Sequence, residues 1–314
     1  KRFSYILLLF VGFGAYSQSE YRFSNFTINN GLSQSSVTTI IQDELNSLWV
    51  GTQDGLNRYN GTSFEIFTSD DTKGLESEYI ICSAKDKNGN LWFGTSKGLT
   101  QYNLRTQSFQ TFTDKNGVAF HIQDISIDGH GNLWLASAES GIYKFSVSQK
   151  KVLNHGIIIP SKKTTNIAIT ESGSLIVSTE DAGVYLCNIA KSSVERVFLN
   201  RKGGSNLIIN NIILSGKDNV IFVTNQGACE LNIRTKRVTT KFEELTLEYG
   251  LQNISDAVQQ NEIGWLICTN NNGLFILNEN GEIHHSTEDI FQKTALLFNQ
   301  LNSIYKDGSG TFWI

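Results

Sequence analysis

One phrase of the sequence recurs at a nearly constant interval along most of the chain. It reads LWVGTQDGLNRY, then LWFGTSKGLTQY, then LWLASAESGIYKF, and it is weaker afterwards. Its aligned positions are 43, 42, 42, 45, 45 and 47 residues apart, at Trp49, Trp92, Trp134, Ile176, Ile221, Leu266 and Trp313. Short β-rich units repeated every ~40–50 residues are typical of propeller blades, so this repeat constrains the fold more than any other feature.

Each repeat has the pattern of four short antiparallel strands. In the first repeat we expect strands at Val37–Gln42, Leu48–Thr52, Leu56–Tyr59 and Phe64–Thr68. Tight-turn signals, Asp54-Gly55 and Asn60-Gly61, separate the last three of them. The inner strands are apolar on both faces, as expected where each blade lies between two neighbours, and the last strand alternates like a half-exposed outer strand.

The repeated Trp is predicted to fill the wedge between adjacent blades. A smaller apolar residue is expected to fill the wedge where the repeat has lost its Trp, at Ile176, Ile221 and Leu266. Gly51 and Gly94 each follow the Trp by two residues. A missing side chain at these positions would let a neighbouring blade approach closely.

The turn before the Trp reads Asp86-Lys-Asn-Gly-Asn-Leu-Trp92, and it recurs from Asp128 to Trp134. It resembles the start of a calcium loop, but the glutamate that would supply the bidentate ligand is missing. We therefore favour an Asx-type turn, in which the Asp carboxylate accepts backbone N–H groups.

Counting strands predicts an all-β fold, a seven-bladed β-propeller of four-stranded antiparallel blades. The predicted propeller spans residues 21–314, with blades at 36–73, 79–115, 121–160, 164–203, 208–246 and 254–295, and a seventh at 301–314 plus 21–28. In this scheme the last blade is incomplete and is closed by an N-terminal strand. A naked edge in that blade is a liability that native proteins avoid, so we expect this chain to be the N-terminal part of a longer protein.

Residues 1–17 are interpreted as a secretory signal peptide. Lys1 and Arg2 precede the apolar run Tyr5–Phe13, and Ala15-x-Ser17 provides a small-residue cleavage site. A buried N-terminal strand and an uncleaved anchor are the alternatives. Export would place the four cysteines, Cys82, Cys187, Cys229 and Cys268, in an oxidising compartment. Each lies in an apolar strand pattern, so buried free thiols are favoured over a disulfide framework.

No catalytic, metal or cofactor motif stands out from the sequence. The chain lacks G-x-S-x-G, Walker-type, Cys-x-x-Cys and His-Glu-x-x-His patterns, and His284-His285 is interpreted as part of a solvated outer strand or loop. The net charge of −4 at pH 7 argues against nucleic acids and anionic membranes as partners. We therefore expect no catalysis, no cofactor, no metal and no nucleic-acid partner in this region.

The segment GLSQSSVTTIIQDELNSLWVGTQDGLNRYNG resembles the two-component regulator propeller repeat. The resemblance extends from Phe23 to Ile314 and is strongest in the first three blades. It implies the periplasmic region of an inner-membrane sensor of the Bacteroidetes hybrid two-component type. The partners it implies are downstream domains of the same chain, ending in a histidine kinase or a DNA-binding output. Its implied ligands are oligosaccharides released from polysaccharides.

The residues that precede each first strand are expected to surround the mouth of the central channel and to bind a small ligand. These candidates are Ser36, Tyr79, His121, Lys163, Asn253 and Gln300, with Ile208 at the same aligned position. The loops between second and third strands add Gln53, Asp54, Lys97, Glu139, Asp181, Gln226 and Asn271. The alternative explanation is that these loop residues are polar only because loops are exposed to solvent.

Three functions are compatible with this pattern. The leading hypothesis is a sensor that reports ligand occupancy through rearrangement of its domains or of a homodimer. The alternatives are an exported propeller enzyme, such as a lyase or glycosidase, and a scaffold that binds another protein on its rim.

Overall fold

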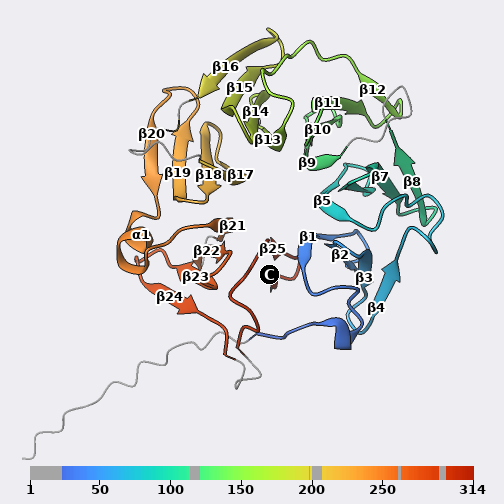
Figure 1. The fold of residues 1–314 in the computed structure, drawn as a ribbon, viewed down its shortest axis with the longest axis horizontal. Helices are drawn as coiled ribbons and strands as arrows, with labels where there is room; N and C mark the ends of the chain where they lie inside the picture. Colours follow the sequence, from blue (N-terminus) through green and yellow to red (C-terminus); the bar gives the residue numbers. More distant parts are fainter. Residues whose placement is uncertain (1–22, 114–120, 198, 200–206, 261–262, 290–294) are drawn as a thin grey trace, which may run out of the picture.

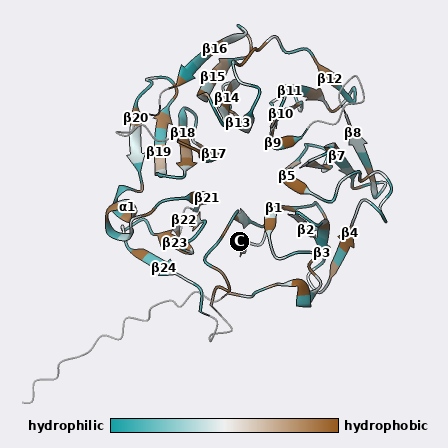
Figure 2. Cartoon of the chain, in the orientation of Figure 1, coloured by the Kyte–Doolittle hydropathy of each residue, from teal (hydrophilic) through white to brown (hydrophobic). Residues whose placement is uncertain are grey.

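The computed structural model of the chain describes residues 23–113, 121–197, 199, 207–260, 263–289 and 295–314. Six four-stranded antiparallel sheets surround a common axis like blades, and a two-stranded hairpin lies between the sixth blade and the first (Figure 1). In every blade the first strand of the repeat lies nearest the axis and the fourth lies at the rim (Figure 1). Hydrophobic residues are distributed over all the blades rather than collected in one layer (Figure 2).

The short 3-10 helix η1 (Ile28–Asn30) precedes the first blade. Blades one to three comprise β1 (Val37–Gln42), β2 (Leu48–Thr52), β3 (Gly55–Tyr59), β4 (Phe64–Phe67), β5 (Ile80–Lys85), β6 (Leu91–Thr95), β7 (Gly98–Asn103), β8 (Ser108–Phe112), β9 (Ile122–Ile127), β10 (Leu133–Ser137), β11 (Gly141–Ser146) and β12 (Lys151–Leu153).

Blades four to six comprise β13 (Thr164–Ile169), β14 (Ser174–Thr179), β15 (Gly183–Asn188), β16 (Ser193–Val197), β17 (Ile209–Ser215), β18 (Asn219–Thr224), β19 (Gly227–Asn232), β20 (Val238–Lys241), β21 (Ile254–Gln260), β22 (Gly264–Thr269), β23 (Leu274–Leu277) and β24 (Ile283–Ser286). The helix α1 (Glu243–Tyr249) connects blades five and six, and the hairpin consists of β25 (Tyr305–Lys306) and β26 (Phe312–Trp313).

The prediction of seven blades is wrong, because the structure has six. Among the described residues, 23–27 form no strand, so the N-terminal segment does not supply an outer strand. The segment from Leu301 to Ile304 forms no strand either: Leu301 N–H donates to Thr269 O and Ile304 N–H to Asp256, and strand pairing begins only at Tyr305 and Lys306, in the hairpin. Sequence similarity to the repeat therefore did not produce a further blade here.

An Asp carboxylate organises the turn before each of the four Trp residues at the aligned position of the repeat. Asp86 Oδ1 accepts the N–H groups of Asn88 and Asn90, and its Oδ2 accepts the Trp92 indole N–H at 2.8 Å. The same three-bond arrangement is found at Asp43, Asp128 and Asp307. The predicted Asx-type turn is thereby confirmed, and the carboxylate additionally satisfies a ring donor that the sequence analysis did not assign to it.

The wedge between blades is filled as predicted. Trp49, Trp92 and Trp134 are fully buried, and each packs on residues of the following blade. Ile176 and Ile221 occupy the corresponding clusters between blades four, five and six. The large aromatic ring is therefore needed only where the neighbouring blade leaves space for it.

Two glycines let the blades approach one another. A Cβ at Gly51 would lie 2.7 Å from Ile80 Cγ2 in the second blade. A Cβ at Gly94 would lie 2.4 Å from Cys82 Sγ and 2.5 Å from Ile122 Cγ2 in the third blade. The predicted role of both glycines in close approach is confirmed. All four cysteines are buried and free, which agrees with the favoured interpretation.

Side chains of the inner strands bond to the backbone of the next blade and close the ring without a covalent link. Each of these bonds runs from a side-chain donor to a carbonyl oxygen of the neighbouring segment. The donor and acceptor pairs are Thr38 with Ile80, Asn166 with Asn210, Asn210 with Ile254, Ser255 with Leu301, and Asn302 with Val37. The last pair joins the segment before the hairpin to the first blade.

Two inner-strand carboxylates reinforce these contacts. Asp256 accepts hydrogen bonds from the Asn211 side chain at 2.7 Å and from Ile304 N–H at 3.0 Å, so it links blade five, blade six and the hairpin segment. Asp124 accepts the Ile167 N–H of blade four at 2.8 Å. Burial among the inner strands raises the pKa of Asp124 to about 7 and that of Asp256 to about 6, because it disfavours the charged form.

Replacement of the turn carboxylate is expected to destabilise the fold. Asp86→Ala leaves the buried Trp92 indole N–H and two backbone N–H groups without their acceptor, so the free energy of unfolding should fall by roughly 2–4 kcal/mol. Asp54→Ala, at an exposed turn position, should change it by less than about 0.5 kcal/mol. Urea unfolding of both variants checks this, and equal effects would contradict the anchoring role.

Addition of a single methyl group tests the close approach of blades two and three. Gly94→Ala should cost roughly 1–3 kcal/mol, because the new Cβ overlaps Cys82 and Ile122. Gly129→Ala is a matched control, since nothing lies within 4 Å of its Cβ position. Thermal unfolding should separate the two variants, and a neutral Gly94→Ala would refute the tight contact.

Stability is expected to depend on pH through Asp124. Its pKa is raised to about 7 in the folded chain, so the folded state binds more protons than the unfolded state above the ordinary Asp pKa. The free energy of unfolding therefore falls as pH rises through this window, by up to about 1.4 kcal/mol per pH unit.

Asp124→Asn removes this contribution and should flatten the dependence between pH 4.5 and 7, as measured by urea unfolding. Burial lowers the pKa of His155, which contributes a slope of opposite sign, so the readout is the difference between the variant and the unchanged chain. Parallel curves for the two proteins would show that Asp124 is not buried as described.

Candidate functional site

The loops before the inner strands and the turns between second and third strands lie together on one side of the disc, here called the mouth face. In five blades, the carbonyl of the residue before the inner strand accepts an N–H from that turn at 2.9–3.4 Å. These pairs are Tyr79 with Ser96, His121 with Ala138, Lys163 with Glu180, Ile208 with Asn225, and Asn253 with Asn270. Both predicted sets of candidate residues therefore belong to the same face.

The predicted ligand contacts differ in how they present their side chains. Tyr79 is 38% exposed, and His121 and Asn253 are half-buried. Ser36, Lys163, Ile208 and Gln300 are exposed. Lys163 is paired with Glu180 at 3.5 Å, a solvent-exposed ion pair that contributes little to stability.

Gln300 differs from the others, because it precedes the hairpin segment and not an inner strand. Of the second-to-third loop candidates, Gln226 is half-buried, and the others are exposed. The exposed ones are Gln53, Asp54, Lys97, Glu139, Asp181 and Asn271. Their role as ligand contacts stays a prediction.

A polar cavity of about 330 Å³ lies just inside the mouth face. We call it the throat, and it is lined by Gln123, Thr165, Asn166, Ile209, Asn210, Ser255, Asn270 and Asn302. These residues come from the inner strands β9, β13, β17 and β21, from the β22–β23 turn and from the segment before the hairpin. The throat thus brings four blades and the ring-closing segment to one place.

β-Bulges explain why the throat is polar. Each inner strand shifts register against its neighbour after the first residue, and Gln123, Asn210 and Ser255 are the residues left without a partner. In β13 the corresponding unpaired residues are Thr165 and Asn166. A bulge re-aims the side chain of the extra residue, here toward the axis, while the paired residues keep packing between blades.

Sequence analysis missed the throat residues. The available signal was a polar residue in second position of the inner strand, present in blades three to six but replaced by Ile81 in blade two. Asp124 and Asp256 follow one residue deeper, and burial raises the pKa of both. Lys85 and Lys306 lie at the far ends of their strands, away from the mouth face. Of the charged residues within the inner strands, the two nearest the throat are therefore carboxylates.

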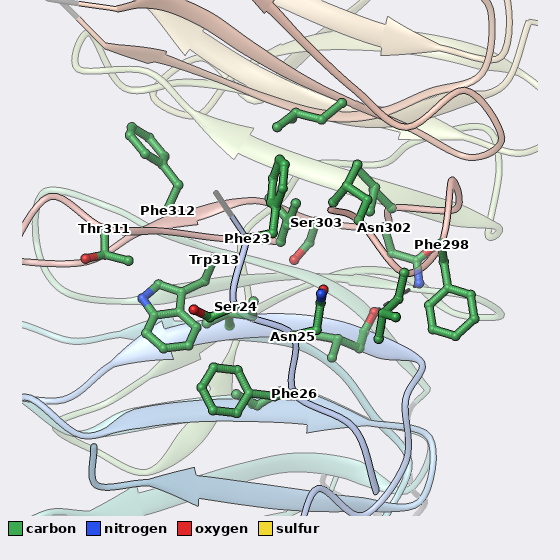
Figure 3. Close-up of a pocket in the computed structure, with 18 of the residues that line it drawn as sticks. Phe23, Ser24, Asn25, Phe26, Phe298, Asn302, Ser303, Thr311, Phe312 and Trp313 are labelled. Carbon is green, nitrogen blue, oxygen red and sulfur yellow. Dashed lines mark hydrogen bonds between the residues drawn. The ribbon is translucent and has the colours of Figure 1, made fainter. Parts of the chain in front are cut away.

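A second, largely apolar cleft of about 540 Å³ runs between the sixth blade and the first, beside the hairpin. Figure 3 shows Phe23, Phe26, Phe312 and Trp313 along its walls. Phe26 contacts Trp313 with ring centroids 5.9 Å apart and Tyr59 of the first blade at 5.2 Å. These contacts make the N-terminal segment an apolar link between the hairpin and blade one.

The remaining sequence candidates are accounted for by packing. His285 lies on the outer strand β24, stacks on Phe275 with ring centroids 4.0 Å apart and bonds to Asn272 O, as expected for a structural residue. In the described part of the chain, no group of three His, Cys, Asp or Glu side chains could hold a metal ion. No helix among the described residues is long and apolar enough to cross a bilayer.

Comparison with known proteins relates this geometry to a family. Residues 31–54 and 74–97 match the family model of the two-component regulator propeller. Over 66 residues the chain is 48% identical to "Histidine kinase P4" of Formosa agariphila, a stretch that is 21% of this chain and 5% of that protein. The chain therefore spans a small part of this relative.

Solved structures share the fold over nearly the whole chain. The extracellular domains of two hybrid two-component systems of B. thetaiotaomicron superpose with TM-scores of 0.79 and 0.76, at 22% and 21% identity. Each match covers 94% of this chain but only 40% and 38% of those chains. A streptogramin B lyase superposes with a TM-score of 0.64 at 11% identity, over 90% of this chain and 91% of its own.

At these identities the structural likeness shows the fold alone. The family match is more specific, since it falls on segments that contain Trp49 of blade one and Trp92 of blade two. It bears out the expectation that the region is not an enzyme, because the matched repeat belongs to a regulator. The chain is a β-propeller whose first two blades carry two-component regulator propeller repeats, as the sequence resemblance predicted.

Proposed function

We propose that this propeller is the ligand-sensing region of a two-component regulatory protein, exported so that it lies on the periplasmic side of the inner membrane. The observation that carries the proposal is the family match in blades one and two. The likeness to extracellular domains of hybrid two-component systems over 94% of the chain supports it. The signal-peptide interpretation of residues 1–17 agrees with export but lies outside the described residues.

The ligand we propose is a small polar molecule, an oligosaccharide, bound at the mouth face. Tyr79 of blade two offers a partly exposed ring on which a sugar can stack, and His121 of blade three and Asn253 of blade six offer hydrogen-bonding groups on the same face. The side chains differ from blade to blade, which would allow an asymmetric ligand to be bound in one orientation. The mouth face thus combines an apolar platform with varied polar groups.

Signalling would follow from a difference in ligand affinity between two states of the complete protein. The output we propose is a histidine kinase or a DNA-binding module further along the chain, reached through rearranged domains or a homodimer. A ligand shifts such an equilibrium only by its differential affinity for the two states. Ligand contacts that span several blades are suited to this, because a change in blade spacing alters all of them together.

Substitution of the mouth residues tests the proposal. Tyr79→Ala and His121→Ala should each weaken binding of the sensed oligosaccharide about tenfold, which corresponds to roughly 1.4 kcal/mol, without lowering the melting temperature. Leu45→Ala is the matched control, since Leu45 is 66% exposed in the β1–β2 turn on the opposite face. A thermal-shift screen against an oligosaccharide panel would identify the ligand, because a ligand of the folded state raises the melting temperature.

Unchanged affinity in both mouth variants would count against this site. Turnover of a screened sugar by the purified protein would instead favour an exported lyase or glycosidase. The length of the streptogramin B lyase match keeps that outcome worth measuring, although 11% identity carries only the fold.

A further inference from the structure

The throat contains polar groups that ring closure does not use. Gln123 is the bulged residue of β9, half-buried in the throat wall, and among the described residues its side-chain amide has no hydrogen-bond partner. The equivalent residue of blade two is Ile81, which closes its part of the ring without any polar side chain. A polar group at this position is therefore not a requirement of the fold.

The bonds that close the ring determine which polar atoms remain in the throat. Ser255 donates its hydroxyl proton to Leu301 O, so only its oxygen lone pairs are left to interact with a ligand. Asn210 and Asn302 turn their side-chain nitrogens toward the carbonyl oxygens of Ile254 and Val37, because a carbonyl can only accept. Each amide nitrogen keeps a second N–H, and among the described residues the side-chain oxygen of each is an acceptor that ring closure does not use.

The charge distribution has the same bias. Asp124 and Asp256 stand one residue below the throat on β9 and β21. The positive groups of the inner strands, Lys85 and Lys306, lie at the far ends, where they contact Glu44 and Gln260. An anion in the throat would lie near these two carboxylates and several oxygen lone pairs, whereas Lys163, which precedes β13 on the mouth face, is exposed and paired with Glu180.

We propose that the throat is a subsite for a hydrogen-bond-donating group, neutral or positively charged, and that it rejects carboxylate and sulfate groups. The chemistry it fits is that of a sugar hydroxyl or an ammonium group. This inference deepens the proposed function, because it names the chemical group of the ligand that enters the channel. It rests on the proposed function for its role in sensing. The throat's preference can be measured without knowing the natural ligand.

Three sugars with one ring framework and different charge are suitable probes: glucosamine, glucose and glucuronate. At pH 7, where the amine of glucosamine is still largely protonated, Asp256 is largely ionised and Asp124 is about half ionised, glucosamine should bind on the order of tenfold tighter than glucuronate, with glucose between them. A glucosamine titration followed by NMR of the side-chain amide groups should shift the Gln123 signal. That signal is identified because it is missing from the spectrum of the Gln123→Leu variant. Gln123→Leu should also weaken glucosamine binding without loss of stability.

The charge preference is tested by Asp124→Asn, which should reduce the discrimination between glucosamine and glucuronate at least threefold. Asp218→Asn makes the same chemical change in the β17–β18 turn on the opposite face and should leave the discrimination intact. Equal binding of glucosamine and glucuronate, or a Gln123 signal that no probe shifts, would overturn the proposal. If oligosaccharides bind through Tyr79 while the throat shows no preference, the sensor proposal stands and only this inference fails. If the throat shows the charge preference while no oligosaccharide binds through Tyr79, the sensor proposal fails and this inference stands.

Discussion

The packing of the propeller depends on the hydrogen bond between a Trp indole and the Asp carboxylate six residues before it. Trp49, Trp92 and Trp134 are fully buried, and a buried indole N–H without an acceptor would cost about 1–3 kcal/mol. The carboxylate removes that cost and at the same time holds the turn that connects the two strands. One side chain thus fixes both the turn and the orientation of the ring in the wedge between blades.

This dual role explains how the repeat degenerates. In blade four, Thr170 replaces the Asp and its hydroxyl still accepts the Ser174 N–H at 3.1 Å, so the turn survives. The wedge residue there is Ile176, whose side chain has no N–H that needs an acceptor. The second carboxylate oxygen of the Asp is therefore no longer needed. Asp and Trp are lost together because each is required mainly by the other, whereas the apolar character of the wedge is retained.

Most of the fold could be predicted from the sequence, but the number of blades and the throat could not. Trp wedges, close glycines and the Asx turn were predictable because each depends on neighbours within one repeat or on the next repeat in the chain. The seventh blade was wrongly predicted because resemblance to a strand phrase does not ensure a pairing partner, and the pairing found in this segment is that of Tyr305 and Lys306 with the second strand of the hairpin. The throat was missed because its contributions from different blades are about 43–47 residues apart, so that no local window contains polar bulge residues of two blades.

The same residues line the throat and close the ring, so the two properties are physically linked. Asn210, Ser255 and Asn302 each donate one side-chain hydrogen to the neighbouring backbone while also lining the cavity. Asp256 holds the ring-closing segment through Ile304 N–H directly beneath them. A group bound in the throat therefore interacts with the contacts that set the spacing of blade five, blade six and the hairpin. Those contacts are hydrogen bonds and not a covalent closure. Occupancy of the channel can therefore alter the geometry of the ring, and the geometry of the ring can alter the channel, through the same side chains.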